Sequence, residues 1–259
     1  MNRIDKKFAD LKREKRTGFV GYLTAGDPDE KTSEQNIRTA LENGVDILEL
    51  GVPFSDATAD GPTIQEASQR ALAGGMTVSK ALEMVKRLRR DFDQPIVLFG
   101  YCNPFFRYGF ESLCSNAAEA GADGLLIVDL AFEESSEIRG LAGQNGLYLI
   151  PLAAPTTDGG RARRMLEKGG GFVYYIMVTG VTGMRERTAS DIDKHIAILR
   201  GCSDLPVAVG FGVRNSEQAR SLSRMADAVV VGSALVEAAR ENRLKTLVAD
   251  LSRSLRGKR

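Results

Sequence analysis

The sequence predicts a single (β/α)8 barrel, and three observations support this fold class. The chain has 259 residues, of which 43% are hydrophobic, and one α/β barrel commonly has about this length. From Gly18 onward, short runs rich in Val, Ile and Leu alternate with amphipathic stretches of helical length, the pattern of repeated βα units around a parallel sheet. About eight such runs can be counted, the number that closes a barrel. We therefore expect one barrel domain over residues 1–259.

The expected strands are spaced so that a helix fits between successive strands. They are residues 19–24, 46–50, 96–101, 124–128, 147–152, 172–178, 207–210 and 228–231. Two segments exceed a minimal unit. One is an opening helix before the first strand, and the other is a long insert after Gly51 that contains TIQEASQRALA ahead of the helix expected from Thr77. We therefore expect an N-terminal helix and an extra helix after the second strand.

Composition and charge exclude several classes of partner. With 35 Lys and Arg against 34 Asp and Glu, the net charge is +1, which gives no excess for binding nucleic acid or an anionic membrane. A small-molecule partner fits better.

The three cysteines form neither a disulfide framework nor a metal pattern, and the single histidine, His195, is expected on a solvated helix face. No run approaches the roughly 20 apolar residues of a membrane span, and no signal peptide is visible, so we expect a cytoplasmic protein.

Glu49 is the first candidate for chemistry. In the strand DILEL, Ile47 and Glu49 alternate with Leu48 and Leu50, so Glu49 points away from its leucine neighbours, toward the barrel or toward the helices. A buried carboxylate has a raised pKa, which suits proton transfer. The alternative is a structural carboxylate that accepts hydrogen bonds from backbone amides.

Two further groups of residues lie in loops that follow strands, where the active sites of such barrels are built. The loop GVPFSDATADGPTIQ carries Asp60, which by itself could be only a turn residue or a helix cap. Glycines and small hydroxyl residues follow the last three strands in TGVTG (179–183), GFG (210–212) and GSA (232–234). Because unobstructed backbone amides and a helix N-terminus bind phosphate, these loops favour a phosphate site over ligand-free turns.

Long motifs make the chain similar to the tryptophan synthase α subunits. They are YLTAGDP at 22–28, LELGVPFSDxxADGPTIQ at 48–65, YCNPFFRYG at 101–109, ADGLLIVDL, APT, FVYYIMVTGVTG, VGFGV and VVVGSALV. The resemblance spans nearly the whole chain, and it implies retro-aldol cleavage of indole-3-glycerol phosphate to indole and glyceraldehyde 3-phosphate. It also implies an α2β2 complex with a β subunit. No metal or organic cofactor is expected in this chain, and pyridoxal phosphate is expected in the β partner.

The resemblance assigns roles to particular residues. Glu49 would shuttle protons, Asp60 would accept the hydrogen bond of the indole N1–H, and Tyr174 would hydrogen-bond near these carboxylates, with Tyr175 facing away. The indole pocket would be lined by Tyr22, Phe99, Leu126, Val128 and Leu152, and the phosphate would contact Gly183, Gly212, Gly232 and Ser233.

This sequence departs from the usual family pattern at several positions. Ala57-Thr58 replaces a usual Pro-Leu, Val128 and Ala131 replace prolines, and Met177 stands where Ser is common. The catalytic pair is intact, so these changes bear on docking and regulation. Three alternatives stay open: a stand-alone lyase that releases free indole, a regulatory subunit that only activates the β chain, and another phosphate-binding barrel such as a sugar-phosphate isomerase.

Overall fold

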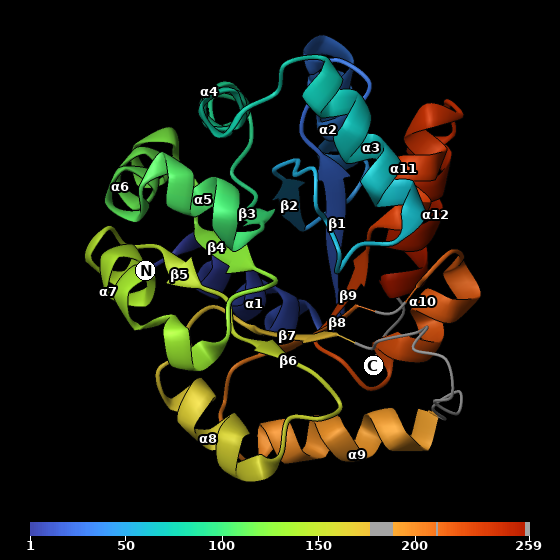
Figure 1. Cartoon of the computed structure of the whole chain (residues 1–259). Helices are drawn as coiled ribbons and strands as arrows, with labels where there is room; N and C mark the ends of the chain where they lie inside the picture. Colours follow the sequence, from blue (N-terminus) through green and yellow to red (C-terminus); the bar gives the residue numbers. More distant parts are fainter. Residues whose placement is uncertain (177–188, 211, 257–259) are drawn as a thin grey trace.

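The structure is a computed structural model that describes residues 1–176, 189–210 and 212–256. Figure 1 shows its strands curled into a barrel with helices on the outside. The strands are β1 (Gly18–Thr24), β2 (Ile47–Gly51), β3 (Ile96–Gly100), β4 (Gly124–Ile127), β5 (Tyr148–Leu149), β6 (Leu152–Ala153), β7 (Val173–Ile176), β8 (Val207–Gly210) and β9 (Ala228–Val231). They pair in parallel in the order β5-β4-β3-β2-β1-β9-β8-β7-β6. The predicted α/β barrel is confirmed.

The barrel closes through a strand that is broken in two. The sheet begins at β5 and ends at β6, and both segments belong to the strand expected at 147–152. Pro151 has no N–H to donate, which interrupts the ladder. The flanking bonds are nevertheless made, since the Ile150 amide donates to the Leu125 carbonyl (2.8 Å) and the Tyr174 amide donates to the Pro151 carbonyl (2.9 Å). The expectation of one continuous fifth strand is therefore wrong in detail.

The helices alternate with the strands, as the sequence pattern indicates. They are α1 (Arg3–Glu14), α2 (Glu30–Glu42), α3 (Pro62–Ala73), α4 (Val78–Leu88), α5 (Cys102–Tyr108), α6 (Phe110–Ala120), the 3₁₀ helix η1 (Phe132–Glu134), α7 (Ser136–Gln144), α8 (Gly159–Glu167), α9 (Ala189–Arg200), α10 (Ser216–Ser223), α11 (Ser233–Arg240) and α12 (Leu244–Leu255). The expected extra helix after the second strand is α3. A further short helix, α5, follows β3 and was not predicted.

Several helices begin at a side-chain cap, which explains where they start. Asp29 accepts a hydrogen bond from the Thr32 amide at the start of α2, and Thr77 accepts one from the Lys80 amide at the start of α4. Helix α1 begins after Asn2, whose side chain accepts from the Ile4 amide. Helix α11 begins after Gly232, which has no side chain to cap it, and no described side chain caps its first amides.

Helix α1 covers the amino ends of the strands. Its buried face carries Ile4, Phe8 and Leu11, and the Phe8 ring lies 5.7 Å from the ring of Phe172, just before β7. In Figure 1 this helix lies behind the barrel. The view therefore faces the opposite end, where the strands finish and where the loops of a barrel build an active site.

Carboxylates at the amino ends of the strands repeat one arrangement. Asp46, Asp123 and Asp227 each stand just before a strand, and each accepts a hydrogen bond from a backbone amide of a neighbouring strand, namely those of Phe19, Ile96 and Val207. Each also binds a guanidinium: Arg16 pairs with Asp46, Arg3 and Arg89 with Asp123, and Arg200 with Asp227. These ion pairs bind helices to this end of the barrel.

Among the described residues, no helix is long and apolar enough to cross a membrane. Within the same residues, no group of His, Cys, Asp and Glu side chains is placed to hold a metal ion. His195 on α9 is half-buried, and its ring stacks on that of Tyr175 with 6.1 Å between centroids. The expectation of a solvated His195 is thus only partly correct, because one face of the ring packs against the barrel.

Candidate active site

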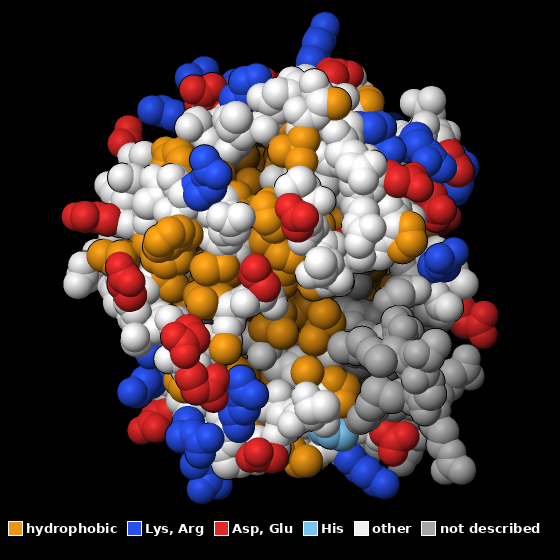
Figure 2. All heavy atoms as spheres, viewed as in Figure 1, with side chains coloured by type: hydrophobic (Ala, Val, Ile, Leu, Met, Phe, Trp, Pro, Cys, Tyr) orange, Lys and Arg blue, Asp and Glu red, His pale blue; other side chains and the backbone are white. Residues whose placement is uncertain are grey.

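A cavity of about 350 Å³ opens at the carboxyl ends of the strands. In the view of Figure 2, apolar side chains gather around the hollowed centre of this face. The wall includes ten of the residues singled out from the sequence: Tyr22, Glu49, Asp60, Phe99, Val128, Leu152, Tyr174, Gly212, Gly232 and Ser233. Of the other two, Gly183 lies outside the described residues, together with Met177. Leu126 is described but is not on the wall.

Glu49 lies on the cavity wall, and its carboxylate is not satisfied by the described part of the chain. Its register neighbours are Tyr22 on β1 and Val97 on β3, and its side chain is completely buried. Neither carboxylate oxygen has a hydrogen-bond partner among the described residues. The alternative of a carboxylate bonded to backbone amides therefore fails in this part of the chain. Burial raises the pKa of Glu49 to about 8, because the charged form loses its hydration.

Asp60 is held in the cavity by Tyr101, the residue that follows β3. The Tyr101 hydroxyl donates to Asp60 Oδ2 (3.0 Å) and accepts a hydrogen bond from the Ala59 amide (3.0 Å). The residue before α3 is Gly61, without a side-chain cap, so Asp60 does not cap this helix. Burial raises the pKa of Asp60 to about 6, and the Tyr101 hydrogen bond opposes that rise. Asp60 is therefore ionised at neutral pH and is available as an acceptor.

The loop that carries Asp60 is also fixed from its own helix. The Gln65 side-chain amide donates to the carbonyls of Ala57 (3.1 Å) and Asp60 (2.8 Å). Ala57 is buried, although its neighbour Thr58 is exposed. Thus Gln65 and Tyr101 together fix both the backbone and the side chain of Asp60.

Tyr174 completes the polar part of the wall. It lies on β7 beside Leu152 and Ala208 in register. Burial first, and then the charges of Glu49 and Asp60, raise the pKa of Tyr174 well above its usual value, so its hydroxyl stays protonated and can donate. Residue 210 is glycine for a steric reason, since a Cβ there would lie 2.8 Å from the Tyr174 hydroxyl. Tyr175 faces outward onto His195, as expected.

The apolar part of the wall forms a slot beside the carboxylates. Tyr22 and Phe99 meet edge to face with 5.1 Å between ring centroids, and Val128 and Leu152 lie on the same cavity wall. Leu126 pairs with Phe99 across the sheet and is completely buried. Leu126 is not among the residues that line the cavity, whereas Val128, two residues further along, is. The assignment of Leu126 to the indole pocket stays a prediction.

The far end of the cavity has the features of an anion site. Gly212 has φ +42°, a conformation that favours glycine. Gly232 and Ser233 stand at the uncapped start of α11, where free amides and the helix dipole favour a negative charge. A Cβ at Gly232 would find its nearest neighbours at 3.6 Å, so the space beside this residue is open.

Sequence reasoning missed the contributions of Tyr101 and Gln65. Tyr101 was given no role of its own within the motif YCNPFFRYG, and its ring packs 5.4 Å from that of Phe54. One signal could have found it: Tyr101 directly follows the strand that neighbours β2, so its hydroxyl lies within reach of a loop that leaves β2. Ile64, Ile176 and Arg214 also line the cavity and were not singled out.

Comparisons with known proteins agree over nearly the whole length of the chain. The family model described as "Tryptophan synthase alpha chain" matches residues 8–256. The chain is 50% identical over 237 residues to the tryptophan synthase alpha chain of Citrifermentans bemidjiense, covering 92% of this chain and 89% of that one. It is also 50% identical over 237 residues to the protein of the same name from Caulobacter sp. strain K31, covering 91% and 86%.

Solved structures are similar as well. A structure from Aquifex aeolicus VF5 has a TM-score of 0.91 at 40% identity and covers 98% of this chain and 99% of that one. A chain from a structure described as tryptophan synthase from M. tuberculosis, in an open form with BRD0059 bound, has a TM-score of 0.91 at 34% identity, with coverage of 98% and 99%.

Proposed function

The chain belongs to the tryptophan synthase alpha chain family, which cleaves indole-3-glycerol phosphate in tryptophan biosynthesis, and we propose that Glu49, Asp60 and Tyr174 carry out this reaction here. The observation that carries the proposal is the buried Glu49, which has no hydrogen-bond partner among the described residues and lies on the wall of a cavity whose far end is the N-terminus of α11. An apolar slot separates these two polar features. A substrate with a planar ring and a terminal phosphate fits this arrangement.

Substrate binding uses two ends of the cavity. The indole ring lies in the slot formed by Tyr22, Phe99, Val128 and Leu152, and the phosphate lies against the amides at Gly232 and Ser233. Gly212 contributes backbone without side-chain obstruction. Fixing both ends holds the bond between indole C3 and the carbinol carbon beside Glu49, which lowers the entropic part of the barrier.

Glu49 transfers the protons of the cleavage. With a pKa of about 8 it is largely protonated at neutral pH, so it can donate to indole C3. The resulting carboxylate then accepts the proton of the side-chain hydroxyl. The carbinol oxygen becomes the aldehyde oxygen, and the electrons of the broken carbon–carbon bond return to the ring. Glu49 ends the cycle protonated, as it began.

Asp60 stabilises the charge that forms between these two steps. Protonation at C3 places positive charge on the ring nitrogen, and the ionised Asp60 accepts the N1–H hydrogen bond. Tyr101 and Gln65 hold Asp60 in place, and the protonated Tyr174 hydroxyl donates beside the two carboxylates. No step of this scheme calls for a metal or organic cofactor on this chain.

Gly232→Asp tests the phosphate end. A Cβ at residue 232 would make only ordinary contacts, the nearest at 3.6 Å, and the new carboxylate repels the substrate phosphate. We expect weaker binding of both indole-3-glycerol phosphate and glyceraldehyde 3-phosphate by titration calorimetry, in a protein with a normal circular dichroism spectrum. Unchanged affinity for both phosphates would contradict this assignment.

We further propose that the chain works as one domain in a cytoplasmic α2β2 complex, with pyridoxal phosphate on the β subunit. Support comes from the family, and from a loop after β2 that carries both Asp60 and exposed residues such as Thr58. The test is steady-state indole production by the chain alone and with saturating β subunit from the same source. A marked increase with β is expected; equal rates would favour the stand-alone lyase, which the Ala57-Thr58 exchange keeps open.

A further inference from the structure

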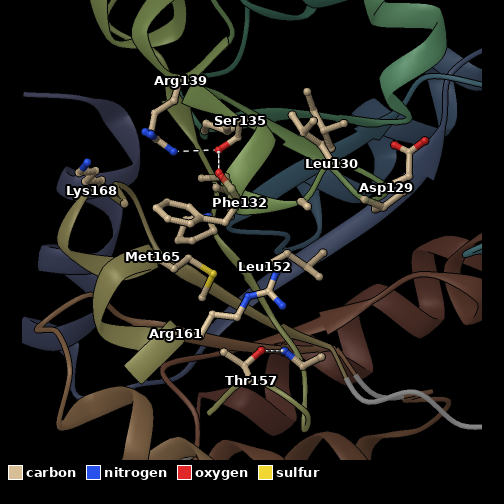
Figure 3. A pocket seen from close by; sticks show the side chains of 18 of the residues that line it. Asp129, Leu130, Phe132, Ser135, Arg139, Leu152, Thr157, Arg161, Met165 and Lys168 are labelled. Carbon is tan, nitrogen blue, oxygen red and sulfur yellow. Dashed lines mark hydrogen bonds between the residues drawn. The ribbon is translucent and has the colours of Figure 1, made fainter. Parts of the chain in front are cut away.

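A second cavity of about 300 Å³ lies behind the apolar slot. Figure 3 shows it between the segment that follows β4 and helix α8. Val128 and Leu152 line both this cavity and the active-site cavity. None of the three proposed catalytic residues lines it. It is therefore a separate space that shares a wall with the indole slot.

The interior of this side cavity is mostly apolar. Phe132, Met165 and Leu152 lie around its centre in Figure 3, with Leu149 and Ile150 also on the wall. Met165 is buried and Phe132 is half-buried. A cavity of this size and lining suits a ring or a short branched chain of a small molecule.

Most of the charged side chains on the wall of the side cavity are cations. The wall carries three cations, Arg139, Arg161 and Lys168, and one carboxylate, Asp129. The Asp129 carboxylate accepts a hydrogen bond from the Cys102 amide (2.7 Å). Arg161 pairs with Glu133 (2.9 Å). The other two cations, Arg139 and Lys168, have no counter-ion among the described residues.

Arg139 is positioned to receive an anion. Its guanidinium donates to Ser135 Oγ (2.8 Å) and lies over the Phe132 ring at 4.8 Å, which fixes its orientation while using few of its five donors. Neither Arg139 nor Lys168 makes an ion pair with any described residue. Both also line an adjoining cleft beside Tyr148, so they stand together at one end of the cavity.

We propose that the side cavity is a second ligand site, which binds a small monocarboxylate with an apolar body. The carboxylate pairs with Arg139 and Lys168, and the apolar body lies between Phe132, Met165 and Leu152. A guanidinium matches a carboxylate with two parallel hydrogen bonds. The half-buried position of Arg139 strengthens that pairing relative to one in open solvent.

The probe is 3-phenylpropionate, which combines a ring with one carboxylate, and its binding is followed by titration calorimetry with the full chain. Saturable binding is expected for the wild type. The neutral amide 3-phenylpropionamide, which has the same shape, is expected to bind at least about tenfold more weakly, since a hydrogen bond to a charged group is lost. Absence of saturable binding by the wild type, or equal affinity for acid and amide, overturns the proposal.

Variants locate the probe. Arg139→Gln is expected to weaken binding at least about tenfold, and Lys168→Gln, a change at an exposed side chain that leaves the fold intact, is expected to weaken it less. The matched control is Arg163→Gln, which removes an exposed arginine from α8 that is not on the cavity wall, and binding should be unchanged. Unchanged binding in both Arg139→Gln and Lys168→Gln overturns the proposal.

The indole slot is the competing location. Titration is therefore repeated in the presence of saturating indole. Binding of 3-phenylpropionate that persists, and that still depends on Arg139, supports the side cavity. Displacement by indole, together with insensitivity to Arg139→Gln, would place the probe in the active site and overturn the proposal.

Discussion

The two ends of the barrel use carboxylates in opposite ways. At the amino end, Asp46, Asp123 and Asp227 each accept a backbone amide of a neighbouring strand and a guanidinium from a helix or terminal segment. At the carboxyl end the described residues give Glu49 no hydrogen-bond partner, and they give the Asp60 carboxylate one hydrogen bond, from Tyr101.

The difference shows how one residue type serves stability at one end and chemistry at the other. A buried carboxylate with satisfied hydrogen bonds stays charged and fixes its neighbours. A buried carboxylate without them is destabilising but has a pKa suited to proton transfer. Burial of the Glu49 carboxylate therefore lowers the stability of the fold, whereas the ion pairs at the opposite end of the barrel raise it.

The strongest test replaces Glu49 with Gln, which keeps the shape but cannot transfer protons. Turnover of indole-3-glycerol phosphate should fall by roughly 10²–10⁴-fold, the usual contribution of general acid–base catalysis. Substrate affinity, measured by calorimetry, should be little changed. Turnover close to that of the wild type would remove Glu49 from the mechanism.

A substitution at the amino end of the barrel is expected to lower stability and to leave turnover unchanged. Asp123→Asn removes the charge partner of Arg89, whose side chain is only 12% exposed. The free energy of unfolding should fall by about 3–5 kcal/mol, with kcat of the folded enzyme unchanged. The control is Glu119→Gln, which breaks the exposed pair with Lys86 and should cost less than about 1 kcal/mol. Equal effects of the two substitutions on stability would undo the comparison.

How far the sequence predicts these features depends on whether a signal is local. Short runs rich in Val, Ile and Leu located the strands, although the fifth is broken in two. The alternation within a run does not tell which side of the strand faces the barrel, so the direction of Glu49 stayed open until the structure placed it on the cavity wall beside Tyr22. Asp60 and Tyr101 are 41 residues apart, and no local pattern links them. The ladder break at Pro151 could have been predicted, because proline lacks an N–H.

The raised pKa of Glu49 predicts how the stability of the protein depends on pH. Folding raises the pKa of Glu49 from 4.5 to about 8, so the folded state retains a proton that the unfolded state releases. Its contribution is fully present below pH 4.5 and is lost progressively as pH rises to about 8. The wild type should therefore lose, relative to Glu49→Gln, on the order of 3 kcal/mol of unfolding free energy between pH 4.5 and 7. Urea unfolding of both proteins across this range measures the difference, and parallel curves would contradict it.

The smallest effect is expected at Tyr101. The Tyr101 hydrogen bond lowers the pKa of Asp60 against the effect of burial, so Tyr101→Phe should raise that pKa above about 6. A hydrogen bond worth about 1 kcal/mol corresponds to a shift of roughly 0.7 pH units. The acidic limb of the kcat/KM profile should move upward by this amount. A lower kcat with an unmoved limb would mean that Tyr101 acts only through the structure of the loop.

The break in the ladder at Pro151 divides the strands of the barrel into two groups, one from each half of the chain. Residues 1–149 supply β1 to β5, and the chain from Leu152 onward supplies β6 to β9, each a contiguous set of neighbours in the sheet. Glu49 and Asp60 belong to the first half of the chain, whereas Gly212, Gly232 and Ser233 belong to the second. Acid–base chemistry and phosphate recognition thus come from different halves of the chain. A substrate that spans the cavity acts as a noncovalent cross-link between those halves, so its binding reinforces the assembly that creates its own site.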